Sequence, residues 1–188
     1  ILREEYGDNE IINAISTSSE SLINVINNAV TLSKVSVGES INLQNLNLTE
    51  LIRNVVREFS SHLDHYNMEI KLNLPENLMV KANPIIIEVF NNYISNAIKY
   101  ASDGKMVNID AVIDSDKITI NFIDYGPTVP EEKRDIIFER NSQLGSEEKR
   151  GRGLGLAIVK RIAEAHNAEV GVKPNIPVGN IFYIEFSV

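Results

Sequence analysis

Hydrophobic and polar residues alternate along the chain with two different periods, which predict helices and strands in turn. Apolar residues three and four positions apart predict four helices, at about 9–33, 49–62, 84–100 and 153–165. Alternating or short continuous apolar runs predict strands at about 41–48, 68–74, 78–81, 106–113, 117–123, 168–172 and 181–188. Thr49 is expected to cap the second helix, and Pro84 to lie in the first turn of the third.

This order of elements indicates an α+β fold. We expect an α/β sandwich, with helices layered on one face of a mixed, mostly antiparallel sheet, preceded by a long bundle-type helix. The segment 131–138 fits neither period, and residues 139–152 are polar and punctuated by glycine.

The first predicted helix carries an apolar seam with the a/d spacing of a helical bundle: Ile12, Ile15, Ser19, Leu22, Ile26 and Ala29. Such a helix buries its seam against partner helices, in another chain or in sequence outside this one; packing on its own domain is the alternative. Residues 37–40 break the pattern as a linker. We therefore expect two units, residues 1–38 and residues 39–188.

Composition and charge narrow the class of protein. The chain has 188 residues, of which 43% are hydrophobic and 23% charged, as in ordinary globular proteins. Its formal net charge of −8 argues against binding nucleic acid or an anionic membrane surface. It has no Cys and no apolar run long enough to cross a bilayer, so we expect a cytoplasmic location, with a membrane reached only through sequence not present here. The chain begins at Ile1 and is expected to be part of a longer protein.

Three polar Asn and Lys side chains share one face of the third predicted helix. Asn92, Asn96 and Lys99 are spaced i, i+4 and i+7. Carboxamide oxygens suit a hard cation, and an ammonium group suits phosphate oxygens. An exposed polar face without a ligand is the alternative for this segment taken alone.

Two glycine-bearing loops add candidate binding groups. Asp124, at the end of a predicted strand, can accept a hydrogen bond from an exocyclic amine, and Gly126 allows a flat base to approach the backbone. The run Gly151–Leu156 precedes a helix, where free amides and the helix dipole favour an anion. Neither a dinucleotide fingerprint nor a P-loop is present. Each loop alone also fits an ordinary turn.

In this order, the three segments resemble the catalytic, ATP-binding domain of sensor histidine kinases, within the superfamily that includes gyrase, Hsp90 and MutL. Residues 92–100 resemble the N box of that family, 124–130 the G1 box, 137–140 the F box and 151–156 the G2 box. The resemblance covers residues 42–188. Residues 9–38 resemble the second helix of the family's dimerisation and phosphotransfer hairpin.

The resemblance implies ATP and Mg²⁺ as ligands. For the metal, it implies that Asn96 binds Mg²⁺ and that Asn92 lies beside it. For the base, it implies that Tyr100 packs near adenine and that Asp124 and Gly126 receive it. The residues implied to contact the phosphates are Lys99, Arg140 at the γ-phosphate, and, along the phosphate chain, Gly151, Arg152, Gly153, Leu154, Gly155 and Leu156. Asn92, Lys99 and Arg140 are the implied catalytic residues. Residues 139–152 would form a mobile lid.

Hydrolases of the superfamily tend to carry a Glu four residues before the metal-binding Asn, as a general base for water. This chain has Asn92 there, which favours transfer of the γ-phosphoryl group to a protein side chain. The resemblance implies a protein-histidine kinase, a response-regulator receiver domain as partner, and a homodimer in the full-length protein.

The histidine acceptor is expected to lie outside this chain. None of its three histidines, His62, His65 and His166, has the His-Glu or His-Asp context of an acceptor, so the fragment alone should not phosphorylate itself. Thr128 replaces the second glycine of the G1 box, which supports the alternative of a degenerate nucleotide-binding or regulator-docking module. The bundle-like first helix disfavours a serine kinase of the anti-sigma-factor type.

Overall fold

The structure is a computed structural model that describes residues 41–139 and 154–187, together with a few single positions of the first predicted helix. Its elements follow in this order: β1 (Gln44–Asn47), α3 (Leu48–Glu58), α4 (Ser60–Tyr66), β2 (Glu69–Asn73), β3 (Met79–Ala82), η1 (Pro84–Ile86), α5 (Ile87–Ala101), η2 (Ser102–Gly104), β4 (Met106–Ile113), β5 (Lys117–Asp124), η3 (Glu131–Lys133), η4 (Ile136–Phe138), α6 (Gly155–Ala165), β6 (Glu169–Pro174) and β7 (Asn180–Ser187).

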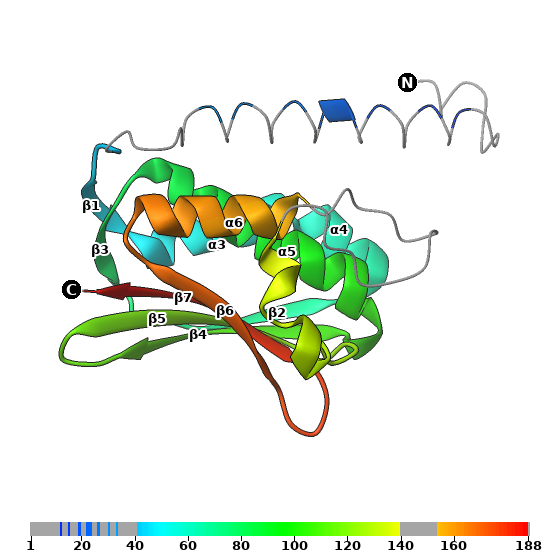
Figure 1. Cartoon of the computed structure of the whole chain (residues 1–188). Helices are drawn as coiled ribbons and strands as arrows, with labels where there is room; N and C mark the ends of the chain where they lie inside the picture. The colour runs from blue at the N-terminus through cyan, green and yellow to red at the C-terminus, as the bar shows by residue number, and fades with distance from the viewer. Residues whose placement is uncertain are drawn as a thin grey trace.

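A five-stranded sheet in the order β2-β4-β5-β7-β6 forms one layer of the molecule, and α3, α4, α5 and α6 lie on one face of it (Figure 1). Strands β2 and β4 pair in parallel, whereas the other neighbours pair antiparallel. Strands β1 and β3 form a separate two-stranded sheet. The predicted sandwich, with helices on one face of a mixed, mostly antiparallel sheet, is confirmed.

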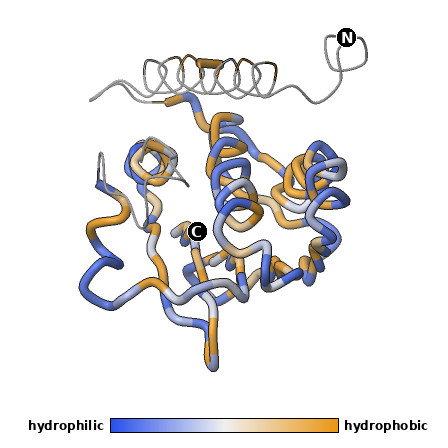
Figure 2. Tube along the Cα trace, turned by 90° about the vertical axis from the view of Figure 1, so that its right-hand side faces the viewer, coloured by the Kyte–Doolittle hydropathy of each residue, from blue (hydrophilic) through white to orange (hydrophobic). Residues whose placement is uncertain are grey.

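The core lies between the two layers. Along β5 every second residue is buried, and around each helix hydrophobic and hydrophilic residues alternate (Figure 2). At the centre, the Phe90 and Phe122 rings stack with centroids 5.9 Å apart, and the Tyr93 ring lies 5.1 Å from that of Phe122. These contacts hold α5 over the middle of the sheet.

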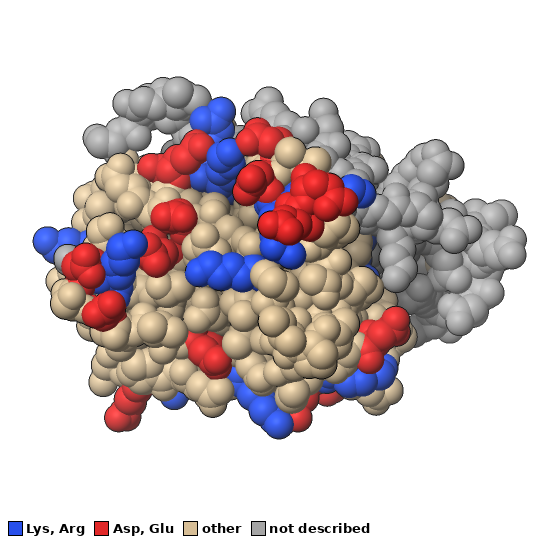
Figure 3. All heavy atoms as spheres, turned by 60° about the horizontal axis from the view of Figure 1, so that its bottom comes forward, with Lys and Arg blue, Asp and Glu red and all other residues tan. Residues whose placement is uncertain are grey.

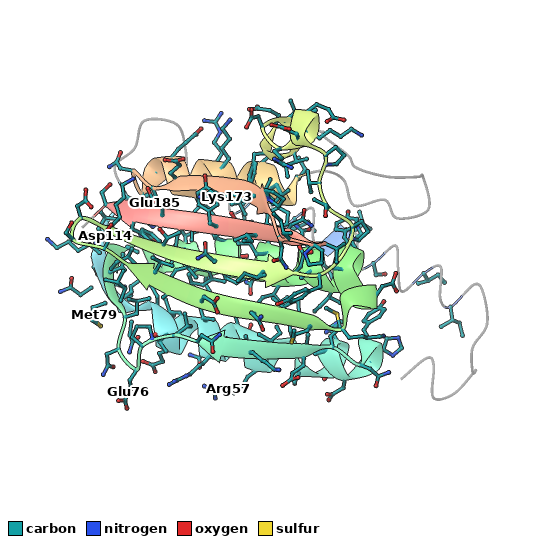
Figure 4. All side chains as sticks on the ribbon, turned by 90° about the horizontal axis from the view of Figure 1, so that it is seen from below. Arg57, Glu76, Met79, Asp114, Lys173 and Glu185 are labelled. Carbon is teal, nitrogen blue, oxygen red and sulfur yellow. The ribbon has the colours of Figure 1, made fainter. Side chains whose placement is uncertain are left out.

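The opposite face of the sheet carries charged side chains of both signs, interspersed with other residues (Figure 3). Glu185 of β7 and Lys173 of β6 are labelled on this face in Figure 4. Lys117 Nζ of β5 lies 2.5 Å from Glu185 Oε1, and Lys173 Nζ lies 4.6 Å from the ring centroid of Tyr183. Water and salt screen such exposed pairs, so each of them is weak. This face therefore adds little to the stability that the buried face supplies.

Two local predictions need correction. Thr49 does not cap the second helix: Asn47 does, because its Oδ1 accepts the backbone N–H groups of Thr49 and Glu50. The Thr49 hydroxyl is buried and instead donates to the carbonyl of Pro75, at 2.7 Å. The predicted helix 49–62 is also two helices, α3 and α4, which meet at Phe59.

The predicted bundle-type helix over 9–33 lies for the most part outside the described residues. The described positions of this segment are all helical: Ile12, Ile15, Ser19, Leu22, Ile23, Ile26, Val30 and Ser33. Ile15, Leu22, Ile23, Ile26 and Val30 are between 46% and 61% exposed. Within the part of the chain that the structure describes, no helix is long and apolar enough to span a membrane.

A buried histidine joins the end of α6 to the start of α5. His166 Nε2 accepts the backbone N–H of Asn83 at 2.9 Å, so the ring proton sits on Nδ1, which faces the carbonyl of Ile162 at 2.7 Å. Asn83 in turn caps η1, with its Oδ1 accepting from Ile85 N, and donates from Nδ2 to the carbonyl of Asn42. Burial lowers the pKa of His166 from its ordinary value of 6.5.

This histidine should make the stability of the fold depend on pH. The unfolded chain binds a proton at His166 below about pH 6.5, while the folded chain resists it, so the free energy of unfolding should fall as the pH drops from 7 towards 6. Urea denaturation at several pH values measures this slope. His166→Gln should flatten it, and His65→Gln, at an exposed histidine of α4, should not. An equal slope in wild type and His166→Gln would contradict the assignment.

Candidate functional site

The polar face of α5 is where the sequence predicts it. Val89, Phe90, Tyr93, Ile94, Ala97, Ile98 and Ala101 are buried on the other side of the helix. Asn92, Asn96 and Lys99 are half-buried, and Tyr100 is 39% exposed. Lys99 Nζ lies 5.0 Å from the centroid of the Tyr100 ring. The face thus presents two carboxamides, one ammonium group and an aromatic ring along one side of the helix.

The N-terminus of α6 meets this face at Asn92. The Asn92 side chain donates from Nδ2 to the carbonyl of Glu88 at 2.7 Å, which leaves Oδ1 directed at α6. A Cβ built on Gly155 would lie 2.4 Å from Asn92 Oδ1, far inside van der Waals contact. The two helices approach this closely because residue 155 has no side chain.

The first turn of α6 offers backbone N–H groups to an anion. Leu154 stands at the N-cap position, and no side chain caps this end among the described residues. The first amides of a helix have no intrahelical acceptor, and the helix dipole adds a partial positive charge there. The chemistry of this end suits a phosphate or another anion.

Asp124 ends β5 as a buried carboxylate, only 4% exposed. Its Oδ1 accepts the N–H of Gly126 at 3.0 Å and the side-chain amide of Asn180 at 3.1 Å. Burial raises the pKa of Asp124, and these donors partly offset that rise. A buried carboxylate so held is a fixed hydrogen-bond acceptor.

The loop after β5 packs directly on the end of α5. A Cβ at Gly126 would lie 2.5 Å from the Cβ of Ala101 and 3.1 Å from the carbonyl of Tyr100. The sequence assigned Gly126 to the approach of a base; in the structure its close neighbour is α5. The contact places Asp124 beside the Lys99–Tyr100 end of the polar face.

The structure brings most of the predicted site residues together. Asn92, Asn96, Lys99 and Tyr100 come from α5, Asp124 and Gly126 from the end of β5, and Leu154, Gly155 and Leu156 from the start of α6 (Figure 1). Ile137 and Phe138 of the predicted F box are buried in η4. The other predicted site residues lie outside the described residues: Arg140, Gly151, Arg152 and Gly153.

Asn180 is a site residue that sequence reasoning missed. It is 5% exposed at the start of β7, and its side chain bonds the Asp124 carboxylate and the loop that follows. The available signal was weak: a lone amide residue after Pro-Val-Gly, at the beginning of an otherwise apolar strand.

Comparison with known proteins bears on the family of this chain. Residues 82–188 match the family described as histidine kinase-, DNA gyrase B- and HSP90-like ATPases. The sensor protein KdpD of Clostridium acetobutylicum is 33% identical over 176 residues, which cover 90% of this chain and 19% of that protein. The chain thus spans about a fifth of that relative.

Solved structures give the same result for the fold. The catalytic domain of the histidine kinase ThkA matches with a TM-score of 0.69 at 26% identity, covering 78% of this chain and 98% of that domain. ThkA in complex with the response regulator protein TrrA matches with a TM-score of 0.72 at 24% identity, covering 98% and 54%. Full-length ShkA in complex with AMPPNP matches with a TM-score of 0.75 at 24% identity, covering 94% and 38%.

The chain belongs to the family of histidine kinase-, DNA gyrase B- and HSP90-like ATPases. Among its relatives are sensor histidine kinases, and the resemblance stated from the sequence is confirmed.

The contact between Asn92 and Gly155 can be tested by paired substitutions. Gly155→Ala should lower the melting temperature, because the new Cβ collides with Asn92 Oδ1. In an Asn92→Ala background the same change should be neutral or stabilising, since Ala favours a helix over Gly by about 1 kcal/mol. Thermal unfolding of the four proteins measures the coupling. Equal effects of Gly155→Ala in both backgrounds would show that the two residues do not touch.

Proposed function

We propose that the chain is the ATP-binding catalytic portion of a two-component sensor histidine kinase. It would donate the γ-phosphoryl group of ATP to a histidine outside this chain, for onward transfer to an aspartate of a response regulator. The observation that carries the proposal is the convergence on α5. Its polar face meets the N-terminus of α6 at Asn92, an end that no described side chain caps, and the buried carboxylate lies towards the Tyr100 end. The distribution of these groups fits phosphates at one end and an adenine at the other.

In this proposal each group has one task. Asp124 accepts the adenine amino group, Tyr100 packs on the base, Lys99 contacts phosphate, and the amides of Leu154, Gly155 and Leu156 hold the phosphate chain. Gly151, Arg152 and Gly153 would extend that cradle, and Arg140 would reach the γ-phosphate; these four remain predictions from the sequence. The need for local positive charge in an acidic chain is met by Lys99 and the helix end.

Mg²⁺ is proposed to bind through Asn96, with Asn92 beside it. Mg²⁺ takes oxygen ligands and is usually held by one or two protein groups together with phosphate oxygens and water. The half-buried carboxamide of Asn96 suits such a site. Within the described residues no cluster of three or more His, Cys, Asp or Glu side chains could replace it. The bound ion would offset negative charge on the phosphates.

The environment of Asn92 supports phosphoryl transfer over hydrolysis. An amide at this position is no general base, and its Nδ2 is already committed to the carbonyl of Glu88. Water near the γ-phosphate would therefore find no carboxylate at this position to remove its proton. A protein acceptor that supplies its own nucleophile avoids that need.

The acceptor histidine is proposed to come from another part of the full-length protein. In His166 both ring nitrogens are already engaged, by Asn83 and Ile162. His62 and His65 lie in α4 and are followed by Leu63 and Tyr66, not by an acidic residue. The fragment alone should then not label itself.

The proposal extends to the organisation of the parent protein. Residues 1–38 would be the second helix of a dimerisation and phosphotransfer hairpin, and residues 39–188 the catalytic domain. The exposed apolar residues of the first segment, such as Leu22 and Ile26, support a homodimer that buries them. A response-regulator receiver domain is the proposed partner; ThkA, which is similar in fold, has been solved in complex with the response regulator protein TrrA. We also propose a cytoplasmic location, because the proposed reaction uses ATP.

Radiolabelling tests the kinase proposal. With [γ-³²P]ATP and Mg²⁺ the fragment alone should remain unlabelled, and a separately supplied hairpin that carries a His-Glu or His-Asp acceptor should become labelled. Asp124→Asn should reduce that labelling at least tenfold, because an amide presents a donor where adenine needs an acceptor. Ser95→Ala, at an exposed residue of the same helix, is the control and should label normally. Label on the fragment itself would refute the proposal.

Metal removal tests the role of Asn96. Calorimetry should show that EDTA weakens binding of a non-hydrolysable ATP analogue to the wild-type chain. Asn96→Ala should bind the analogue with the weaker affinity in both conditions, because its metal ligand is gone. Retention of full Mg²⁺ dependence by Asn96→Ala would assign the metal to another residue.

A further inference from the structure

The turn between β6 and β7 lies against the end of β5, where Asp124 begins the G1 loop. Gly179 has φ +114°, and a Cβ there would lie 2.0 Å from the carbonyl oxygen of Asp124. On the other side of the turn, Asn175 Nδ2 donates to the same carbonyl at 3.2 Å, and Asn175 N donates to the carbonyl of Gly179 at 3.0 Å. The turn is thus attached to the backbone of the residue that carries the buried carboxylate.

Thr128 attaches the far side of the G1 loop to the same turn. Its Oγ1 accepts the backbone N–H of Gly179 at 3.1 Å. A glycine at position 128, as the family usually has, would leave that N–H without this acceptor. The hydroxyl therefore restrains a loop that a second glycine would loosen. Thr128 therefore has a structural use in this chain, besides departing from the usual pattern of the family.

Asn180 completes the attachment from β7. Its Nδ2 donates to the carbonyl of Pro127 at 3.0 Å and to the carboxylate of Asp124, while its Oδ1 accepts the N–H of Val129 at 2.7 Å. One buried amide side chain thus bonds three residues of the G1 loop. Thr128, Asn180 and the turn 175–179 together form what we call the hairpin clamp on the loop.

We propose that the hairpin clamp is a built-in part of the adenine end of the site, with Thr128 and Asn180 as positioning residues that fix the Asp124 carboxylate before nucleotide arrives. This inference rests on the proposed function, since it assumes that Asp124 receives the base. Neither residue needs to touch the nucleotide. Both act through Asp124 and the loop.

The hydrogen bonds also distinguish the two oxygens of the Asp124 carboxylate. Oδ1 accepts from Gly126 N and from Asn180 Nδ2, at 3.0 and 3.1 Å. Oδ2 receives a longer bond from Asn180 Nδ2, at 3.3 Å. Oδ2 is therefore the more weakly held of the two oxygens, and the one we expect to meet a ligand donor. An amino group at position 6 of adenine complements it, whereas the 6-carbonyl of guanine opposes it.

A preset acceptor raises affinity for the correct base because less ordering remains to be done on binding. It also raises the discrimination between adenine and guanine, since a loosely held G1 loop can rearrange and present a hydrogen-bond donor to the guanine carbonyl. The hairpin clamp should therefore affect the preference for adenine over guanine more than general affinity for triphosphate. A residue that merely held the fold together would weaken both nucleotides alike.

The experiment measures affinities of non-hydrolysable ATP and GTP analogues by titration calorimetry, for the whole chain with Mg²⁺. Thr128→Val removes the hydroxyl and keeps the branched shape; Asn180→Leu removes the amide at similar volume. Each should lower the ratio of ATP-analogue to GTP-analogue affinity by about tenfold, as expected for one or two lost hydrogen bonds at a buried acceptor. Thr128→Ser, which keeps the hydroxyl, should stay within about twofold of wild type.

Thr119→Val is the matched control. Its Oγ1 lies 3.2 Å from Glu185 Oε2, on the sheet face away from the helices, so the same change there should not alter the ratio. Amide hydrogen exchange of Gly179 and Val129, measured without nucleotide, gives a second readout. Protection of Gly179 should fall in Thr128→Val, and that of Val129 in Asn180→Leu.

The outcomes separate the two proposals. If the wild-type chain binds neither analogue at millimolar concentration, the proposed function fails and this inference falls with it. If it binds the ATP analogue and Thr128→Val keeps the wild-type ratio, the hairpin clamp has no role in selecting the base and only this inference fails. Equal weakening of both analogues would also overturn it. Thr128 is exposed, so Thr128→Val decides the matter even if Asn180→Leu does not fold.

Discussion

The position of every group in the site depends on how deeply one face of α5 is buried. Phe90 is fully buried and Tyr93 nearly so, and both pack on Phe122 of the central strand. Removing such a ring costs about 3–5 kcal/mol, whereas the single hydrogen bond from Asn92 to Glu88 contributes about 1 kcal/mol. Packing against the sheet therefore fixes the rotation of the helix, and the polar bonds only refine the side chains it presents.

A second constraint acts at the end of β5, where a carboxylate is placed almost out of reach of water. Burial without partners would be costly, and the rise in the pKa of Asp124 reflects that cost. Gly126 and Asn180 offset part of it. The protein thus holds a buried acceptor in a fixed place, a combination that is typical of functional sites. The stability of this corner of the fold, and the base selectivity that we propose for it, depend on the same few hydrogen bonds.

Local sequence patterns predicted what is local in this structure. The amphipathic face of α5, the β4–β5 hairpin and the glycine that begins α6 all follow from spacing within a few residues. The cap at Asn47 was missed because Thr49 fits the same local rule, and only its bond to Pro75, 26 residues away, removes it from that role. Asn180 was missed for the same reason: Asp124, its partner, lies 56 residues earlier. Such pairings follow from topology, which no short motif encodes.

The parallel pairing of β2 with β4 has a kinetic consequence. Helix α5 lies in the chain between these two strands, so it is part of the crossover that joins them. Parallel neighbours require such long connections, and contacts distant in sequence form slowly during folding. In the folded chain the same crossover carries the polar face of α5 to α6 and to the end of β5. A ligand that binds to the polar face of α5 would bind only chains in which the crossover has formed. By mass action, such a ligand would increase the population of these folded chains.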